Sequence, residues 1–248
     1  IEVPDCRFTM NDYGSDGIYI TPRRVGEDGW ELSIKALIDN ADCSHKARFT
    51  LIDADGNEKA STIADLRPII SAKLPVEDPV LWNGRKNPYL YTVRCEIFDS
   101  TTQEVTDNID IRTGLREYHI DSHKGFFLNG EHIKLQGVSR HQDRENMGNA
   151  ITEKQHAEDV KIILDVGANS VRLAHYQQNS YFYDLCDESG LLVWAEVPVI
   201  SRFSPKRNEN AEQQLVELIK QNYNHPSIFC WGIENEITIA GSASKKLI

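Results

Sequence analysis

The stretch with the clearest potential for chemistry is residues 229–236, an apolar run that ends in the adjacent pair Asn235 and Glu236. A short apolar run is typical of a strand buried in a parallel sheet, and α/β barrels carry their catalytic side chains where such strands end. A carboxylic acid at that place can give up and take back a proton, while the amide of Asn235 offers both a donor and an acceptor. We therefore expect Glu236 to carry the chemistry, although an isolated Asn-Glu pair is more often a simple strand end.

Charged and polar side chains also follow the other strands predicted in the second half of the chain. These are Arg140, His141, Asp143, Arg172, His175 and Glu196. Because the carboxyl ends of parallel strands meet at one edge of a sheet, we expect these side chains to lie near Glu236. Each has a plainer interpretation as well: a lone histidine is more often a structural residue, and Glu196 fits equally well in an ion pair with Arg172 beneath a pocket.

The elements that must position these side chains alternate between strands and helices. A hairpin over residues 126–136 turns at 129–130, and its second arm is expected to continue as a strand to the end of that range. Thr152 and Gln155 form a capping-box pattern at the start of a helix that closes at Gly167. Next come a strand at 169–172, a helix at 181–188, a strand at 191–197, a helix around 215–219 and a strand from 229. The alternation predicts a parallel sheet with right-handed crossovers, either half of an eight-stranded barrel or a small open sheet, and the polar strand ends favour the barrel.

Residues 1–113 are predicted to be all β. Alternation with a period of two marks strands at 17–21, 30–38, 47–52, 90–98 and 108–112. Short strands at this spacing within about 100 residues predict a β-sandwich of the immunoglobulin type. No Trp follows Cys43 at the distance that true immunoglobulin domains use to cover their disulfide, so the likeness is one of topology.

Composition limits the partners and the compartment. A net charge of -11 over 248 residues and a pI of about 5.2 argue against nucleic acid, which requires clustered Lys and Arg. No apolar run approaches the length needed to cross a bilayer, so we expect no membrane partner. Five cysteines without CxxC spacing favour free thiols over a disulfide framework or a zinc site. The chain starts at Ile1 without a leader segment, which leaves its localisation open between cytoplasm and periplasm.

Eight short motifs, in the same order along nearly the whole chain, resemble glycoside hydrolase family 2, the β-galactosidase and β-glucuronidase group. The motifs are NPYLY (87–91), GLR (114–116), LNG (128–130), GVSRHQD (137–143), RLAHY (172–176), WAE (194–196), NHP (224–226) and WGIENE (231–236). Several are weak when taken singly, but the set is highly specific.

The resemblance implies an immunoglobulin-like β-sandwich over 1–113, followed over 114–248 by the first four βα units of a truncated TIM (β/α)8 barrel. It implies a retaining β-glycosidase, β-galactosidase-like, that hydrolyses terminal β-linked sugars with Glu236 as general acid/base. By the same resemblance Asn235 bonds the 2-hydroxyl of the sugar. The remaining residues that it assigns to substrate binding are His175, Asp143, His141 and Arg172.

Two departures from the family pattern limit this assignment. Residues 199–202 read VISR where the best-known β-galactosidases carry a Glu-x-His magnesium pattern, so we expect no metal and no other cofactor. Retaining hydrolysis also needs a second carboxylate roughly 5 Å from the first. In the family this nucleophilic Glu follows a later barrel strand. We therefore expect the chain to be a fragment that is inactive alone and that self-associates through its exposed half-barrel edges.

Three alternatives remain open from the sequence. In the first, the parent protein is β-glucuronidase-like rather than β-galactosidase-like. In the second, the chain serves only as a non-catalytic carbohydrate-binding or assembly module. A metal-dependent hydrolase built on His141, Asp143, His175 and Glu236 is the third, although their spacing matches no known ligand signature.

Overall fold

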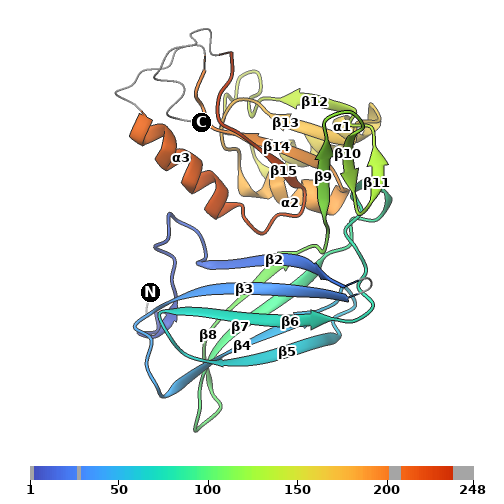
Figure 1. The fold of residues 1–248 in the computed structure, drawn as a ribbon. Coiled ribbons are helices and arrows are strands. Elements are labelled where there is room, and N and C mark those ends of the chain that lie inside the picture. The colour runs from blue at the N-terminus through green and yellow to red at the C-terminus, as the bar shows by residue number, and fades with distance from the viewer. Residues whose placement is uncertain (1–2, 27–28, 201–207, 237–248) are drawn as a thin grey trace.

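The alternating residues of the first half form two antiparallel sheets in the computed structural model, which describes residues 3–26, 29–200 and 208–236 (Figure 1). The first sheet contains β1 (Arg7–Phe8), β2 (Ile18–Val25), β3 (Gly29–Asp39) and β6 (Ile69–Val76), with β3 paired to the other three. The second has the order β5 (Glu58–Asp65), β4 (His45–Ile52), β7 (Tyr91–Asp99) and β8 (Val105–Thr113).

The two sheets pack face to face over one apolar core. Fully buried side chains from both sheets fill it, among them Leu32, Leu74, Phe49, Leu51 and Val93. On β3 the pattern of buried and exposed positions alternates along the strand, as a sheet with one buried face requires. The predicted sandwich is therefore confirmed, and Cys43 and Cys95 are free thiols in it.

Three strands of the sandwich, the two-residue β1 and the longer β5 and β6, were not predicted from the sequence. β5 is rich in small and charged residues and has no fully buried position. β6 alternates regularly but contains Pro75, which interrupts a typical strand pattern. In the structure β6 pairs only with β3, so a residue without an N–H is tolerated at this edge of the sheet.

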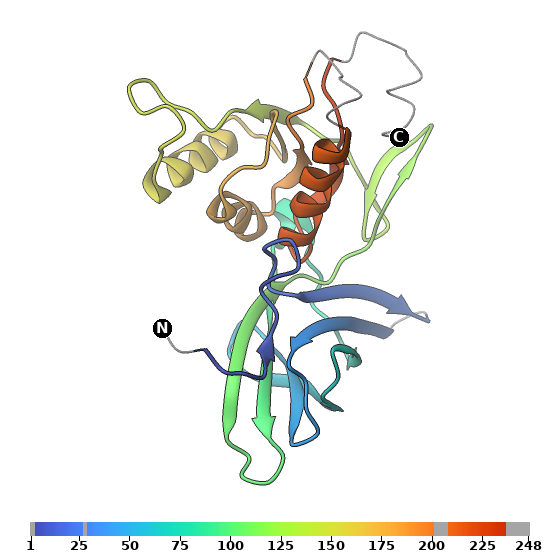
Figure 2. The same ribbon diagram turned by 90° about the vertical axis from the view of Figure 1, so that its left-hand side faces the viewer.

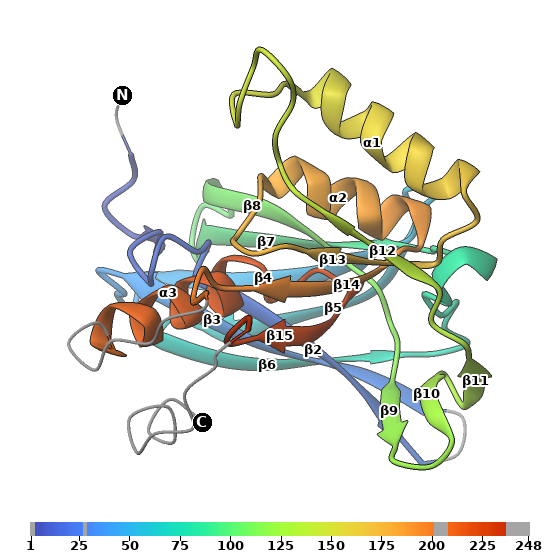
Figure 3. The ribbon, with the colours of Figure 1, turned by 90° about the horizontal axis from the view of Figure 1, so that it is seen from above.

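The second half begins with a small antiparallel sheet of three strands, β9 (Tyr118–Asp121), β10 (Gly125–Leu128) and β11 (Glu131–Ile133). A regular alternation follows it: β12 (Gly137–Arg140), α1 (Glu153–Asp165), β13 (Ser170–Leu173), α2 (Ser180–Ser189), β14 (Leu192–Glu196), α3 (Asn208–Gln221) and β15 (Ile228–Gly232). β12 to β15 form one parallel sheet in chain order, as the sequence predicted. From above, α1 and α2 lie beside each other along these strands (Figure 3).

The prediction that the second arm of the hairpin runs to residue 136 is wrong. β11 ends at Ile133, and the side chain of Asn169 replaces the strand ladder beyond it. Its amide donates to the Lys134 carbonyl at 2.9 Å, and its oxygen accepts from the Gln136 N–H at 2.8 Å. These bonds lead the chain from the hairpin into the parallel sheet. At Gly137 the neighbouring strand is so close that a Cβ would lie 2.5 Å from the Ser170 hydroxyl, so only glycine fits there.

The helix ends follow the predicted signals. The Thr152 N–H donates to Oε1 of Gln155 at 2.8 Å, which is one half of the capping box. α2 starts where Asn179 Oδ1 accepts the Tyr181 N–H at 2.9 Å, and it ends at Gly190 with φ of +71°. Within the described ranges no helix is both long and apolar enough to cross a membrane, and the longest, α3, has 14 residues.

Specific polar contacts join the sandwich to the α/β half, where the loop between β1 and β2 lies against the end of α3 (Figure 2). Asn224 accepts the Ile20 N–H at 2.9 Å and donates to the Ile18 carbonyl at 2.8 Å, so its amide pairs with β2 as a neighbouring strand would. On the other side, Arg112 of β8 pairs with Asp184 of α2 at 2.7 Å. The buried Trp82 indole donates to the Asp187 carbonyl at 2.9 Å.

A buried ion pair behind this interface predicts a pH dependence of stability. His225 Nδ1 lies 2.6 Å from Asp187, whose other oxygen accepts the Ser227 N–H at 3.0 Å. Burial alone lowers the pKa of His225, but the Asp187 charge and hydrogen bond outweigh it and raise the pKa above its ordinary value, with Asp184 adding to and Arg112 opposing this effect. Because the folded state holds this proton more tightly, the stabilisation is complete below the ordinary pKa of about 6.5. It is lost as the pH rises through the higher folded value.

Urea unfolding between pH 5.5 and pH 9 measures this effect. We expect the free energy of unfolding to fall across the upper part of that range and the fall to be reduced in His225→Gln. His123→Gln is the matched control, since His123 is exposed and has no side-chain ion pair among the described residues. Equal slopes in all three proteins would show that the His225 pair does not contribute.

Candidate active site

Three of the predicted site residues meet at the carboxyl edge of the parallel sheet around one buried carboxylate. Arg172 lies near the end of β13, His175 follows that strand, and Asn235 lies just beyond β15. The carboxylate is Glu196, the last residue of β14, the strand between them, and its side chain is 1% exposed. Chain order in the sheet therefore explains why residues so distant in sequence are neighbours.

Both oxygens of Glu196 are bound. Arg172 donates Nε to one oxygen at 3.0 Å and Nη2 to the other at 3.1 Å, and His175 Nδ1 contacts that second oxygen. A carboxylate accepts only, so Nδ1 of His175 must carry a hydrogen. Nε2 is then the ring nitrogen available to a ligand. Glu196 thus orients two side chains, which was the structural alternative considered for it from the sequence.

Arg172 also fixes the orientation of Asn235. Its Nη2 donates to Asn235 Oδ1 at 2.8 Å. Since a guanidinium has no acceptor, the atom facing it must be the amide oxygen, and the amide NH2 is left for another partner. Asn235 is 9% exposed, and its backbone N–H donates to the Val199 carbonyl at 2.8 Å.

Glu236 follows Asn235 directly but, unlike Asn235, is exposed to solvent. Its side chain forms no hydrogen bond or ion pair with another described residue, and its φ is +53°. A residue with a Cβ rarely adopts this left-handed conformation, and such residues concentrate at functional sites. The dehydrated setting that a proton donor at neutral pH requires is not provided by the described neighbours.

The two residues predicted after β12 lie at the margin of this cluster. The His141 ring is 5.4 Å from the His175 ring, centroid to centroid, and 6.0 Å from the Tyr176 ring. Asp143 is exposed, and its side chain forms no hydrogen bond or ion pair within the described ranges. The structure therefore brings together Arg172, His175 and Asn235 and places His141 beside them, while no described hydrogen bond or ion pair links Asp143 to this cluster.

Close packing between strands supports the cluster from beneath. A Cβ at Gly232 would lie 2.6 Å from Glu196 Cβ and 2.4 Å from the Trp194 indole nitrogen. Glycine at this position of β15 is therefore what lets Glu196 and Trp194 occupy their places. A hollow of about 260 Å³ lies on the same face of the sheet, with Arg172, Trp194 and Phe229 among its walls.

Residues that the sequence did not single out complete the surroundings. The Tyr176 hydroxyl accepts the Gln142 N–H at 2.9 Å, and Gln178, 4% exposed, donates to the Arg140 carbonyl at 3.0 Å. The sequence does not predict which glutamines are buried, because nothing in their residue type or spacing indicates burial.

Two groups of described residues have a geometry that could hold a metal ion, and both lie elsewhere. They are Cys6, Asp42 and His45 in the sandwich and Asp184, Asp187 and His225 at the interface between the halves. Neither contains a residue of the metal-dependent alternative considered from the sequence, so the geometry gives that alternative no support.

A parallel α/β sheet with an amide, an imidazole and carboxylates at its carboxyl edge has these groups where α/β enzymes place their active sites. Comparison with protein families makes this specific. Residues 120–248 match the TIM barrel domain of the glycosyl hydrolases family 2, and residues 16–116 match a second model of the same family. The chain belongs to glycosyl hydrolase family 2, as the resemblance of its motifs implied.

Individual relatives carry two different activities in their names. A β-glucuronidase of Bacteroides fragilis is 39% identical over 93% of this chain and 35% of its own length. A β-galactosidase of Thermoanaerobacter pseudethanolicus is 31% identical over 90% of this chain and 31% of its own length. The crystal structure of an FMN-binding β-glucuronidase from Faecalibacterium prausnitzii L2-6 has a TM-score of 0.93 and 39% identity, covering 99% of this chain and 38% of that one. The chain thus spans about a third of the length of these relatives.

Proposed function

We propose that the protein containing this chain is a retaining β-glycosidase in which Glu236 is the general acid and base. The observation that carries the proposal is the bond from Arg172 to the Asn235 oxygen, since it leaves the amide NH2 of the residue before Glu236 as the group that can donate to a ligand. An NH2 donor suits a sugar hydroxyl oxygen, and a bond to the 2-hydroxyl strengthens as the oxocarbenium-like transition state forms. His175 Nε2, with His141 and Asp143 at the margin, completes the sugar-binding set in this proposal.

A second carboxylate must supply the nucleophile. Glu196 does not fit this role, because both of its oxygens are bound by Arg172 and His175 and its side chain is buried. Glu234 is two residues from the acid, although the attacking carboxylate has to face it across the sugar at about 5 Å. We assign the nucleophile to a part of the protein outside this chain, so that the chain alone binds sugar without turning it over.

The parallel sheet is, in this proposal, the first half of an eight-stranded barrel that starts after residue 113. The face of the sheet opposite the helices supports this, because large apolar side chains on it are exposed. Trp194 of β14 is 39% exposed, and Val138 of β12 is 36% exposed. A closed barrel buries that face under the side chains of its other strands. Self-association of the isolated chain through the exposed edges of the half-barrel remains a prediction.

For the sugar, we place a β-glucuronide first and a β-galactoside second. The motifs alone favoured the galactosidase assignment. Among the relatives a β-glucuronidase reaches 39% identity and the T. pseudethanolicus β-galactosidase 31%, while a crystal structure described as a putative β-galactosidase of Bacteroides fragilis reaches 38%. The FMN of the F. prausnitzii enzyme is not carried over, because hydrolysis of a glycosidic bond transfers no electrons.

Steady-state kinetics of the protein containing this chain test the proposal. With p-nitrophenyl β-D-glucuronide and β-D-galactoside as paired substrates, we expect the kcat/KM of the glucuronide to be greater by about 100-fold or more, since a site built for one polar group rejects sugars that lack it. Proton NMR should show the β-anomer as the first product. A first-formed α-anomer would exclude retention, and hydrolysis of neither substrate would leave a sugar-binding module as the better assignment.

A further inference from the structure

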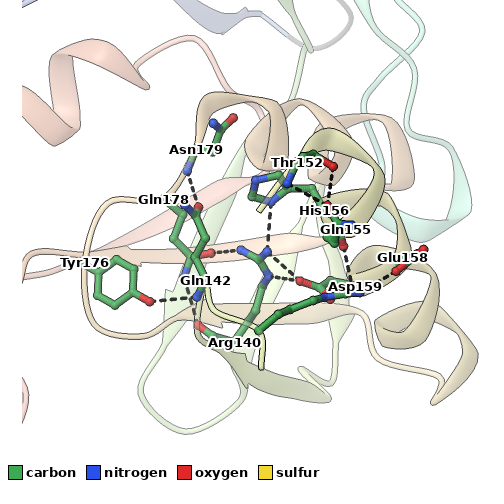
Figure 4. Close-up of polar contacts among 11 residues, drawn as sticks. Arg140, Gln142, Thr152, Gln155, His156, Glu158, Asp159, Tyr176, Gln178 and Asn179 are labelled. Carbon is green, nitrogen blue, oxygen red and sulfur yellow. Dashed lines mark hydrogen bonds and ion pairs between the residues drawn. The ribbon is translucent and has the colours of Figure 1, made fainter. Parts of the chain in front are cut away.

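Arg140 lies next to the site with several polar partners, and the sequence placed it among the strand-end side chains without a specific role. It ends β12 and is 6% exposed. Its guanidinium donates Nε and Nη2 to Asp159 of α1 at 3.0 and 2.7 Å and Nη1 to Gln178, while Nη2 lies 3.0 Å from His156 Nδ1 (Figure 4). The guanidinium carbon lies 3.9 Å from the ring centroid of Phe182 in α2. One residue thus links β12 to both neighbouring helices.

The partners of Arg140 match its charge. A buried guanidinium is tolerated only when its donors are occupied by acceptors, and Asp159 supplies the compensating charge. His156 must accept through Nδ1 and therefore be neutral. Its burial, followed by the nearby charge of Arg140, lowers the pKa of His156 and keeps the ring in that state.

Arg140 also holds both ends of the loop that carries His175. Its carbonyl accepts the Ala174 N–H at 3.0 Å, directly before His175. The same carbonyl accepts Gln178 Nε2 at 3.0 Å, while Gln178 Oε1 accepts from the guanidinium, so one glutamine is bound by both the backbone and the side chain of Arg140. Between these anchors the Tyr176 hydroxyl bonds the Gln142 N–H (Figure 4).

We propose that Arg140 is a positioning residue of the active site, which holds loop 174–178 so that the His175 ring stays against Glu196 and presents Nε2 to the sugar. The inference rests on the proposed function for its catalytic consequence, but the placement of His175 is a separate, directly measurable property. A displacement of about 1 Å in a reacting geometry costs up to about 100-fold in rate, so a loop held at both ends by one residue has kinetic importance.

The test is Gln178→Met in the complete protein, which removes the loop clamp while leaving Arg140 with Asp159 and His156. Arg140→Met is the stronger variant, and Gln178→Met keeps the proposal testable if that protein does not fold. The matched control is Arg144→Met, because Arg144 also binds Asp159, at 2.7 Å, and Glu158, at 2.6 Å, but does not contact loop 174–178. We expect kcat for an aryl β-glycoside to fall about 10- to 100-fold in Gln178→Met with KM changed less than about threefold, and both constants to stay within about threefold in the control.

A second readout does not depend on activity. In protein labelled with 15N-histidine, the imidazole signals of His175 should shift and broaden in Gln178→Met and remain as in the wild type in Arg144→Met. If the wild type hydrolyses no glycoside but the His175 signals respond in this way, the proposed function fails and the positioning role stands. If neither kcat nor the His175 signals change in Gln178→Met, Arg140 does not position this loop.

Discussion

Replacement of Glu236 with glutamine is expected to lower kcat for an alkyl β-glycoside by about 1000-fold. A positioned general acid contributes roughly 100- to 10,000-fold, and glutamine keeps the size of the side chain but has no proton to deliver to the departing oxygen. Glutamine has the same backbone and side-chain shape as glutamate at this left-handed position, so the loss is expected to report the carboxyl group rather than the chain conformation.

The leaving group gives this prediction its specificity. The 2,4-dinitrophenolate of a 2,4-dinitrophenyl glycoside leaves without protonation. We therefore expect cleavage of this glycoside, measured as a pre-steady-state burst, to slow far less than cleavage of the alkyl substrate. Glu234→Gln is the matched control, since it changes the same residue type two positions earlier and should keep at least about a fifth of the wild-type kcat. An equal loss for both leaving groups would indicate that Glu236 is not the proton donor.

The second large effect is expected for Glu196→Gln. Both carboxylate oxygens accept hydrogen bonds, whereas an amide presents one oxygen and one NH2, which would face the donors of Arg172 or His175. The change removes the carboxylate charge that pairs with Arg172 beside the buried residue 196. Loss of one partner of a buried pair typically lowers the free energy of unfolding by about 3 kcal/mol. Because Asn235 and His175 depend on this pair for their orientation, we also expect kcat to fall about 100-fold.

Thermal unfolding and kinetics at the same pH test this second prediction. Glu212→Gln, a change of the same type at an exposed position of α3, serves as the control and should alter neither quantity. Unchanged kcat with lowered stability in Glu196→Gln would restrict Glu196 to holding the sheet together.

The sequence predicted the fold where the pattern followed directly from chain geometry. Alternation on β3 and β7, the cap at Gly190 and the apolar run of β15 each depend on local rules, so strands, helix and parallel order appear where expected. The strand-end rule also brought Arg172, His175 and Asn235 to one edge, because parallel strands share their carboxyl side.

Other features lie beyond such rules because they depend on contacts between distant segments. The end of β11 is set by the Asn169 side chain, which is more than thirty residues away, and no local pattern contains that information. The buried positions of Gln178 and Arg140 result from how α1 and α2 pack on the sheet. Polarity at these positions suggests solvent exposure, and only the packed structure shows that each polar group has a partner.

The amide of Asn224 in the α/β half binds the sandwich. It occupies the hydrogen-bonding edge of β2 in the sandwich only four residues before β15 starts, the strand that leads to Asn235 and Glu236. Through these bonds the sandwich supports the start of the strand that leads to the proposed acid. Chimeras that graft a sandwich from one family member onto the barrel of another should preserve catalysis only if the donor brings a compatible docking edge for this asparagine.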